Sequence, residues 1–599
     1  MKPTSDNYAF FAAAWEKDLS IARELSHQSS RLTALRTISF ILLIFAFAAG
    51  YDGHTAGTIA GCLLLAAFCL LVRRHSRLKA SLQYNACHLQ VVKDFLNRFN
   101  GDWKGFADDG TPLQPKDHPQ ATDLHLFGPA SFYQYLSCAR TLRGKKRLAA
   151  ALTTTPPSRT KILARQESVA ELIQRKEFAL QLLAQAAQLP DRHDTTELLA
   201  EIEAPLAQGS HAIVRYRTAW MLPVITILSL VLAAFDMLAW TIPGFLLILQ
   251  FLLAIVFHPY NQQVLAPLHH LTHELHFYEA LFQDIEQTKF QSTTLNGLQQ
   301  RLQAGQASQS LHQLAALADY NALTRNFFFA LLGGTLLLWD CHMAARFAHW
   351  HDTAAENLRE WIDIWSEFEV LLSLATIGQT RSQWTFPELK DGQPALEAQE
   401  LTSLLLAEDK AVPNDAHFRA GTCILTGSNM SGKTTYMRTL AGAVVLAYAG
   451  APVCARFFSL TPLHIFTSIQ VNDDMSQGIS TFYAELLRIK QMVTFSHREL
   501  PMLICIDEIF KGTNSADRII GAREAIKQLT RFYCITLVTT HDFELCDLKS
   551  PNAIPVTNCH FEEYYEENKI KFDYKLKPGR CQTTNAQYLL RMAGILADE

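Results

Sequence analysis

Uncharged apolar blocks occur in two pairs along an otherwise mixed chain. In the first pair, residues 37–50 and 55–72 contain no charge and are separated by four residues. In the second pair, residues 219–235 and 237–257 are uncharged and are divided by the single Asp236. Blocks of this length that return after a short turn are typical of transmembrane helical hairpins. The pattern therefore predicts four transmembrane helices in two hairpins.

Basic residues flank both pairs and indicate their orientation. Arg31 and Arg36 precede the first pair, Arg73 begins a basic run after it, and Arg215 and Arg217 precede the second pair. Because Lys and Arg favour the cytosolic side of a membrane, we expect both ends of each hairpin in the cytosol. The first block is short for a span, since its 14 residues rise about 21 Å as a helix. A buried helical hairpin in a soluble domain is the alternative.

The rest of the chain before residue 400 is predicted to be mainly helical. Residues 123–204, 259–317 and 356–377 repeat apolar positions every three or four residues, with charged faces between them. A third apolar block, residues 327–339, is too short to span a membrane, and we expect a core helix there. The predicted regions are an N-terminal part with the first hairpin at 1–120, a helical core at 121–218, the second hairpin at 219–258, a helical lever at 259–400 and an α/β domain at 401–599.

The α/β domain contains a sequence typical of a phosphate-binding loop. Residues 423–426 have the pattern of a buried strand, and residues 435–448 that of a helix whose N-terminus faces the loop. Glycines in the loop let backbone N–H groups surround a phosphate, a lysine reaches the β- and γ-phosphates, and a threonine hydroxyl binds Mg²⁺. The predicted ATP-binding residues are Gly427, Ser428, Asn429, Met430, Ser431, Gly432, Lys433, Thr434 and Thr435.

Two further predicted strands end in polar residues that nucleotide hydrolases use. Residues 503–506 lead into Asp507 and Glu508, and residues 535–538 are closely followed by His541. An aspartate at such a strand end holds Mg²⁺ through water, and the next carboxylate can polarise the attacking water. Ligands bind beyond the carboxyl ends of strands in doubly wound sheets. The three motifs together therefore predict one ATP-hydrolysing site.

The order of these motifs and their residues resemble those of the ATPase domain of the MutS family of DNA mismatch-repair proteins. The resemblance is strong over residues 412–548, and residues 123–128 and 165–169 more weakly resemble the start of the family's helical core. The Asn-Met pair in the loop and the Ser-Thr-Phe triplet separate this family from general ABC-type ATPases. The matching segments are Val412-Pro413-Asn414-Asp415, Thr426 to Arg438, Gly478 to Glu485, Asp507-Glu508-Ile509, Gly512 to Ser515 and Thr540-His541-Asp542.

The resemblance implies a dimeric P-loop ATPase in which each nucleotide is closed by the partner subunit. Ser480 of the opposite copy would reach the γ-phosphate, although a serine there also fits an ordinary helix N-cap. Asn414 would lie near the adenine. The other implied roles are phosphate and Mg²⁺ binding by Lys433 and Thr434, metal support by Asp507, activation of water by Glu508 and sensing of the γ-phosphate by His541.

The chain departs from mismatch sensors where those proteins contact DNA. Their N-terminal domain inserts a Phe-x-Glu reader beside the mispaired base, whereas residues 1–120 carry a predicted membrane hairpin and offer only Trp103 and Phe106 in a linker-like stretch. The second hairpin stands about where the family's DNA clamp is inserted. We therefore expect a multi-pass protein of the inner or plasma membrane with a cytosolic ATPase domain. Its expected partners are a second copy, lipid and an unidentified protein.

Composition narrows the alternatives. The 599 residues include 53 Lys and Arg against 57 Asp and Glu, a net charge of −4, which gives no global signal for a polyanion. The 12 cysteines show neither CxxC pairs nor metal-like spacing, as in reduced cytosolic proteins.

A membrane-tethered MutS homologue whose ATPase is stimulated by DNA is the alternative function. An ABC-type transporter is disfavoured because the predicted spans hold no charge pair, and a non-hydrolysing scaffold because the predicted catalytic residues are all present.

Overall fold

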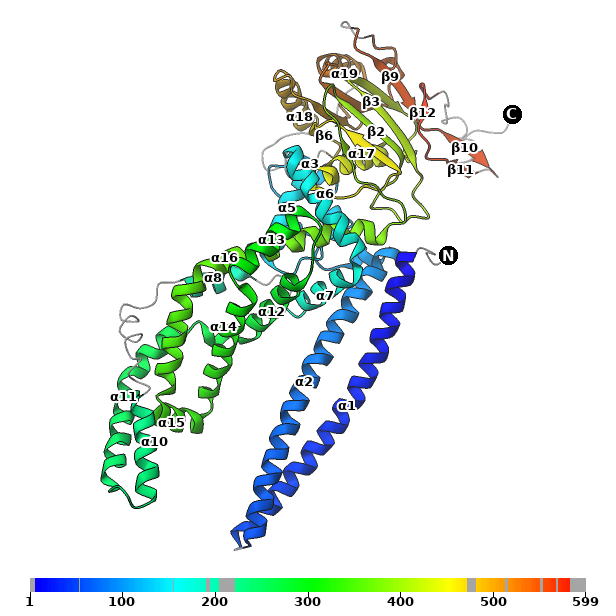
Figure 1. Ribbon diagram of the computed structural model, residues 1–599. Coiled ribbons are helices and arrows are strands. Elements are labelled where there is room, and N and C mark those ends of the chain that lie inside the picture. Colours follow the sequence, from blue (N-terminus) through cyan, green and yellow to red (C-terminus); the bar gives the residue numbers. More distant parts are fainter. Residues whose placement is uncertain are drawn as a thin grey trace.

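The computed structural model consists of a long helical part and a C-terminal α/β domain (Figure 1). It describes residues 6–52, 54–153, 156–189, 194–203, 221–470, 481–511, 515–549, 553–566 and 569–581. Within these residues, long helices precede Thr380 and all strands follow it. The order of the two parts agrees with the predicted fold class.

Two helical hairpins extend away from the α/β domain (Figure 1). The first pairs α1 (Asp6–Tyr51) with α2 (Thr55–Asn100), and each of these helices has 46 residues. The second pairs α10 (Met221–Ala234) with α11 (Thr241–Leu265). Both turns lie at the end of the molecule that is farthest from the strands.

The first hairpin is held together differently at its two ends. At the root, the rings of Phe11 and Phe95 stack with centroids 4.6 Å apart. Near the turn, glycines allow close approach, because a Cβ on Gly57 would lie 2.7 Å from the backbone nitrogen of Gly50. The outward side chains near the turn are apolar and exposed; Phe45, for example, exposes 70% of its surface. The protein therefore buries the apolar root of this hairpin and leaves its outward apolar surface near the turn uncovered.

Three helices are long and apolar enough to cross a membrane: α1, α2 and α11. The helix α10 has 14 residues and is shorter than the predicted span at 219–235. The helices α1 and α2 run well past the predicted spans at 37–50 and 55–72. Their 46 residues correspond to about 69 Å, against a hydrocarbon thickness of about 30 Å. Only the half of the hairpin near its turn matches a bilayer, and the other half connects it to the core.

A helical core lies between the hairpins and the α/β domain. The helix α16 (Trp339–Thr380) runs through it, and every residue from Phe368 to Thr380 is buried. It packs against α11 and against α5 and α6. The other helices are α3 (Pro119–Asp123), α4 (Phe132–Leu136), α5 (Leu142–Thr153), α6 (Arg159–Gln174), α7 (Lys176–Ala186), α8 (Thr195–Glu203), α12 (Leu268–Gln287), α13 (Thr293–Ala304) and α14 (Ala307–Ala322), with 3-10 turns at Asp102–Gly105, Thr111–Leu113 and Leu323–Arg325.

The apolar block at 327–339 forms a helix, as predicted. It forms α15 (Phe327–Leu337), which is separated from α16 by Leu338 with a φ of 47°. The helix packs against α11, but Leu332 exposes 66% of its surface. That this helix belongs to the core stays a prediction, because an 11-residue helix that is apolar all round does not show which of its sides the protein covers.

The α/β domain contains two sheets and a hairpin. The larger sheet has the order β12-β9-β4-β8-β7-β6, with all neighbours parallel except β12 and β9. The smaller has the order β1-β5-β2-β3, and β10 pairs with β11. The strands are β1 (Glu388–Leu389), β2 (Ala395–Leu401), β3 (Asn414–Arg419), β4 (Gly421–Thr426), β5 (Phe457–Leu460), β6 (His464–Ser468), β7 (Met502–Ile506), β8 (Cys534–Thr539), β9 (Val556–His560), β10 (Glu563–Glu566), β11 (Lys569–Phe572) and β12 (Lys577–Pro578).

The central strands β4, β7 and β8 are buried along their whole length, which confirms the predicted strands at 423–426, 503–506 and 535–538. The strands begin at Glu388, upstream of residue 401. The helices of this domain are α17 (Lys433–Ala449), α18 (Thr481–Ser496) and α19 (Ser515–Leu529), with a 3-10 turn at Phe543–Leu545.

Candidate nucleotide site

The loop between β4 and α17 has the backbone shape of a phosphate cradle. Gly427 has a φ of 140°, and a Cβ there would lie 2.4 Å from the carbonyl oxygen of Phe561. Gly432 has a φ of 107° immediately before α17. Glycine adopts this left-handed backbone without steric cost. Because α17 begins at Lys433, its unpaired N–H groups and positive dipole end face the loop, where an anion is favoured.

Lys433 lies over this loop. Its Nζ donates hydrogen bonds to the carbonyl oxygens of Gly427 at 2.7 Å and Ser428 at 2.8 Å. Burial lowers the pKa of Lys433, although Asp507 and Glu508 act in the opposite direction. A phosphate oxygen offers this ammonium a charge-assisted hydrogen bond, which is stronger than one to a carbonyl.

Oxygen ligands suited to Mg²⁺ meet beside the loop. The Asp507 carboxylate accepts hydrogen bonds from Thr434 Oγ1 at 2.7 Å and from Thr539 Oγ1 at 2.6 Å. Carboxylate and hydroxyl oxygens are the ligands that Mg²⁺ takes together with water and phosphate. The described residues contain no group of three His, Cys, Asp or Glu side chains that would hold a metal alone. The site therefore fits a Mg²⁺ ion that shares its ligands with a nucleotide.

Glu508 and His541 face each other at this edge of the sheet. His541 Nε2 lies 3.2 Å from Glu508 Oε1 and 3.0 Å from Asn429 Oδ1. Lys511 Nζ lies 2.8 Å from Glu508 Oε2. Burial by itself raises the pKa of Glu508, but Lys511 and His541 together outweigh burial, so the pKa is lower than usual. The carboxylate is therefore ionised at neutral pH, as a general base must be.

A pocket of about 820 Å³ adjoins the phosphate loop and offers room for a base. Phe561, Phe572 and Tyr574 line it with aromatic rings. These residues were missed in the sequence, because they follow the matching motifs on and beside the small β10–β11 hairpin. Their one local signal is a cluster of aromatic residues between positions 561 and 574.

Asn414 lines the same pocket but is held by its neighbours. Its side chain donates to the carbonyl oxygen of Tyr574 at 2.9 Å and accepts from the backbone nitrogen of Leu576 at 2.8 Å. Asn414 therefore fixes the segment that carries Tyr574.

The structure brings most of the predicted site residues together at the carboxyl ends of β4, β7 and β8. Ser480 and residues 512–514 of the matching motifs lie outside the described residues. The residues found together are Gly427, Ser428, Asn429, Met430, Ser431, Gly432, Lys433, Thr434, Thr435, Asn414, Asp507, Glu508 and His541.

Comparison with known families agrees with this geometry. Residues 423–597 match the family model for MutS domain V. The C-terminal domain is therefore similar to MutS domain V, and we refer to it as the MutS domain. The match supports membership of the MutS family, whose proteins bind ATP, typically with Mg²⁺, and generally work as dimers.

Asp123 joins the helical core to the MutS domain. Its carboxylate is fully buried and accepts hydrogen bonds from Thr467 Oγ1 at 2.7 Å and from two backbone N–H groups after β6 at 3.1 and 2.9 Å. Arg488 on α18 approaches it to 3.0 Å. Its backbone oxygen accepts from Arg438 Nε on α17 at 2.8 Å. One residue of the core thus contacts three elements that surround the nucleotide site.

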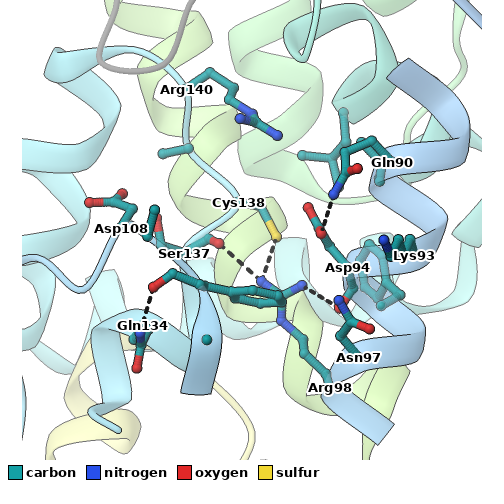
Figure 2. Close-up of a pocket in the computed structure, with 17 residues that line it drawn as sticks. Gln90, Lys93, Asp94, Asn97, Arg98, Asp108, Gln134, Ser137, Cys138 and Arg140 are labelled. Carbon is teal, nitrogen blue, oxygen red and sulfur yellow. Dashed lines mark hydrogen bonds between the residues drawn. The ribbon is translucent and has the colours of Figure 1, made fainter. Parts of the chain in front are cut away.

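A separate hollow of about 500 Å³ lies at the root of α2 (Figure 2). Arg98, which is 4% exposed, donates to the carbonyl oxygens of Tyr135 at 2.7 Å and Ser137 at 3.0 Å. Gln90 donates to Asp94 at 2.8 Å. Figure 2 shows the side chain of Arg98 pointing from α2 toward Ser137 and Cys138. Arg98 therefore fastens the end of α2 to the core.

Trp103 and Phe106 belong to the same root. The indole of Trp103 is buried against Tyr135, with ring centroids 5.1 Å apart. The guanidinium of Arg98 lies 4.9 Å from the ring centroid of Phe106. Both aromatic side chains serve packing here, and neither is presented as a reader of DNA.

Proposed function

We propose that this chain is a membrane-anchored MutS-related ATPase. It binds and hydrolyses ATP at sites completed by a second copy, and it transmits closure of those sites through its helices to the bilayer. The observation that carries the proposal is the combination of a MutS domain V with two hairpins whose exposed apolar side chains lie at the opposite end of the molecule. Exposed apolar surface of this extent marks a membrane or partner interface, and the length of α1, α2 and α11 favours a membrane.

The proposed chemistry follows from the geometry of the site. Lys433 and the N–H groups of the loop bind phosphate oxygens, and Thr434 with Asp507 provides ligands for the metal. Bound Mg²⁺ would neutralise charge on the phosphates. Glu508, which is kept ionised by Lys511, orients a water molecule and takes its proton. His541 lies between the loop and Glu508, where it can respond to the γ-phosphate.

The proposal of a composite site rests on the family's dimers and on the position of α18. This helix begins at Thr481, directly after Ser480, which we propose reaches the nucleotide of the opposite copy. Within one chain, Glu485 on α18 accepts a hydrogen bond from the backbone nitrogen of Phe510 at 2.7 Å. Phe482 packs near Phe510, with ring centroids 5.6 Å apart. A displacement of α18 by a partner would therefore shift the backbone at Phe510, next to Glu508.

Transmission to the membrane is proposed to follow two buried connections. Asp123 links α17, β6 and α18 to the start of the helical core. From the core, α16 runs as one helix of 42 residues to α11 and the second hairpin. Arg98 fastens the root of the first hairpin to the same core. We further propose that the MutS domain lies in the cytosol of a cell whose inner or plasma membrane holds the hairpins.

The test is ATP hydrolysis by the full chain in lipid nanodiscs, with and without duplex DNA. We expect Mg²⁺-dependent turnover that DNA does not change. Stimulation by matched or mismatched duplex at physiological salt would instead support the membrane-tethered DNA-binding alternative. Absence of turnover in nanodiscs and in detergent alike would contradict the ATPase assignment.

A further inference from the structure

Six basic residues form a band around the first hairpin where its apolar half begins. We call this band the collar; it consists of Arg31, Arg36, Arg73, Arg74, Arg77 and Lys79. No Asp or Glu occurs between residues 25 and 51 of α1 or between residues 54 and 93 in α2 and the residue before it. The collar is therefore a region of unmixed positive charge in a chain whose net charge is −4.

Contacts between α1 and α2 place the six residues at one height. The rings of Phe40 and Phe68 meet with centroids 5.7 Å apart, and Asp18 contacts His88 farther toward the root. In this antiparallel pairing, Arg31 and Arg36 lie level with positions 71–77 of α2. At 1.5 Å per residue, the six side chains originate within about 12 Å along the hairpin.

The charged groups of the collar have no hydrogen-bond or ion-pair partner among the described residues. Arg73, Arg74, Arg77 and Lys79 are exposed, and the Nε atom of Arg36 is buried without a hydrogen bond. In contrast, Arg518 of the MutS domain pairs with Asp542 at 2.7 Å. Like charges spaced by less than the Debye length of about 8 Å repel one another. An external anion would relieve this repulsion.

The surface next to the collar identifies the anion. On the side of the turn, the hairpin continues at once with exposed apolar side chains such as Ile38, Phe40 and Leu70. A phospholipid presents the same order, with a phosphodiester directly above acyl chains. A nucleic acid would cover the charges and leave the apolar side chains in water. From the collar to the turn, α2 offers about 27 Å of apolar helix, and long basic side chains can extend to the headgroups.

We propose that the collar binds the headgroups of anionic phospholipids in the leaflet that faces the MutS domain. The inference rests on the proposed membrane anchoring and adds the class of lipid. Each basic residue near an anionic membrane surface contributes roughly a fivefold preference. The full chain should therefore select phosphatidylglycerol over phosphatidylcholine at its lipid contacts.

The experiment measures lipid selectivity of the full chain in vesicles with spin-labelled phosphatidylglycerol or phosphatidylcholine as the probe. We expect at least a fivefold preference for the anionic probe, reduced severalfold by combined substitution of Arg73, Arg74, Arg77 and Lys79 with Gln. The matched control replaces four exposed basic residues of the MutS domain, Arg419, Arg456, Lys490 and Arg523, and should keep the preference.

The outcomes separate this inference from the proposed function. If the chain enters neither zwitterionic nor anionic vesicles, membrane anchoring itself is wrong. If it enters both and shows no preference, or keeps its preference in the collar variant, the inference is wrong and anchoring stands. If the collar variant instead loses salt-dependent binding of duplex DNA while lipid selectivity is unchanged, the collar binds nucleic acid and the inference is overturned.

Discussion

The MutS domain and the first hairpin differ in where they place charged and apolar side chains. In the MutS domain, the central strands are buried and Arg488 and Arg518 lie against aspartates. In the hairpin, apolar side chains such as Leu63 face outward, and the basic collar has no partner in the part of the chain that the structure describes. In the first region, such groups are satisfied within the chain. In the second they are left open, so its proposed function rests on what would cover them.

The largest effect on the MutS domain is expected at Glu508. Replacing Glu508 with Gln keeps its shape and removes the base, so turnover should fall by about 10²- to 10⁴-fold while ATP binding remains. ATP hydrolysis and binding of a fluorescent ATP analogue measure the two effects. Glu524→Gln changes an exposed carboxylate on α19 and should leave both unchanged. Normal turnover in Glu508→Gln would remove the proposed role.

Asp123→Asn tests whether the two regions are coupled. The substitution leaves Arg488 beside a neutral group, and breaking such a buried pair costs roughly 3 kcal/mol. We expect weaker docking of the core on the MutS domain and loss of the ATP-dependent change in hydrogen exchange at residues 119–136. Asp117→Asn, at an exposed position nearby, is the control. An ATP response that persists in Asp123→Asn would show that coupling takes another route.

Glu369 makes the stability of the core depend on pH. Burial raises its pKa from 4.5 to about 7, although Thr141 and the backbone nitrogen of Arg140 donate hydrogen bonds to it. The folded chain therefore holds this proton more tightly than the unfolded chain. The stabilisation is present below pH 4.5 and is lost as the pH rises to about 7, which amounts to at most about 3 kcal/mol.

Glu369→Gln should flatten this dependence. Denaturant unfolding of the detergent-solubilised chain between pH 4.5 and 7 measures it, and Glu360→Gln on the exposed side of α16 is the control. An equally steep loss of stability in Glu369→Gln would assign the dependence to another group.

Arg98→Gln is expected to have the smallest of these effects. It removes charge-assisted hydrogen bonds to three carbonyl oxygens, those of Asp94, Tyr135 and Ser137, and we expect a loss of about 2 kcal/mol in unfolding free energy. Lys93 lines the same hollow from an exposed position, so Lys93→Gln should leave the unfolding free energy unchanged. If both variants are equally stable, Arg98 does not fasten the hairpin.

The sequence predicts the centre of the MutS domain well because its signals are local. The strands at 423–426, 503–506 and 535–538 are continuous apolar runs, and each ends in residues whose chemistry requires that position. Parallel strands bring those ends to one edge, so the gathering of Lys433, Asp507 and His541 follows from the motifs.

Other features depend on contacts between distant segments and leave no local signal. Asp123 meets Arg488 across 365 positions of the chain, and Tyr574 reaches the pocket through Asn414. The length of α1 and α2 was missed because the apolar pattern marks only their outer halves. How much of α15 is covered depends on its packing against α11, which composition does not show.

The most direct test of the central claim measures the distance between the two hairpin turns in nanodiscs. Spin labels at Tyr51→Cys and Met237→Cys, in a Glu508→Gln chain whose six non-buried cysteines are replaced by serine, report this distance by electron paramagnetic resonance. The account predicts that trapping Mg-ATP shifts the distance distribution relative to the nucleotide-free chain, and that Asp123→Asn abolishes the shift. An identical distribution with and without ATP, in a chain shown to bind ATP, would contradict transmission from the MutS domain to the membrane.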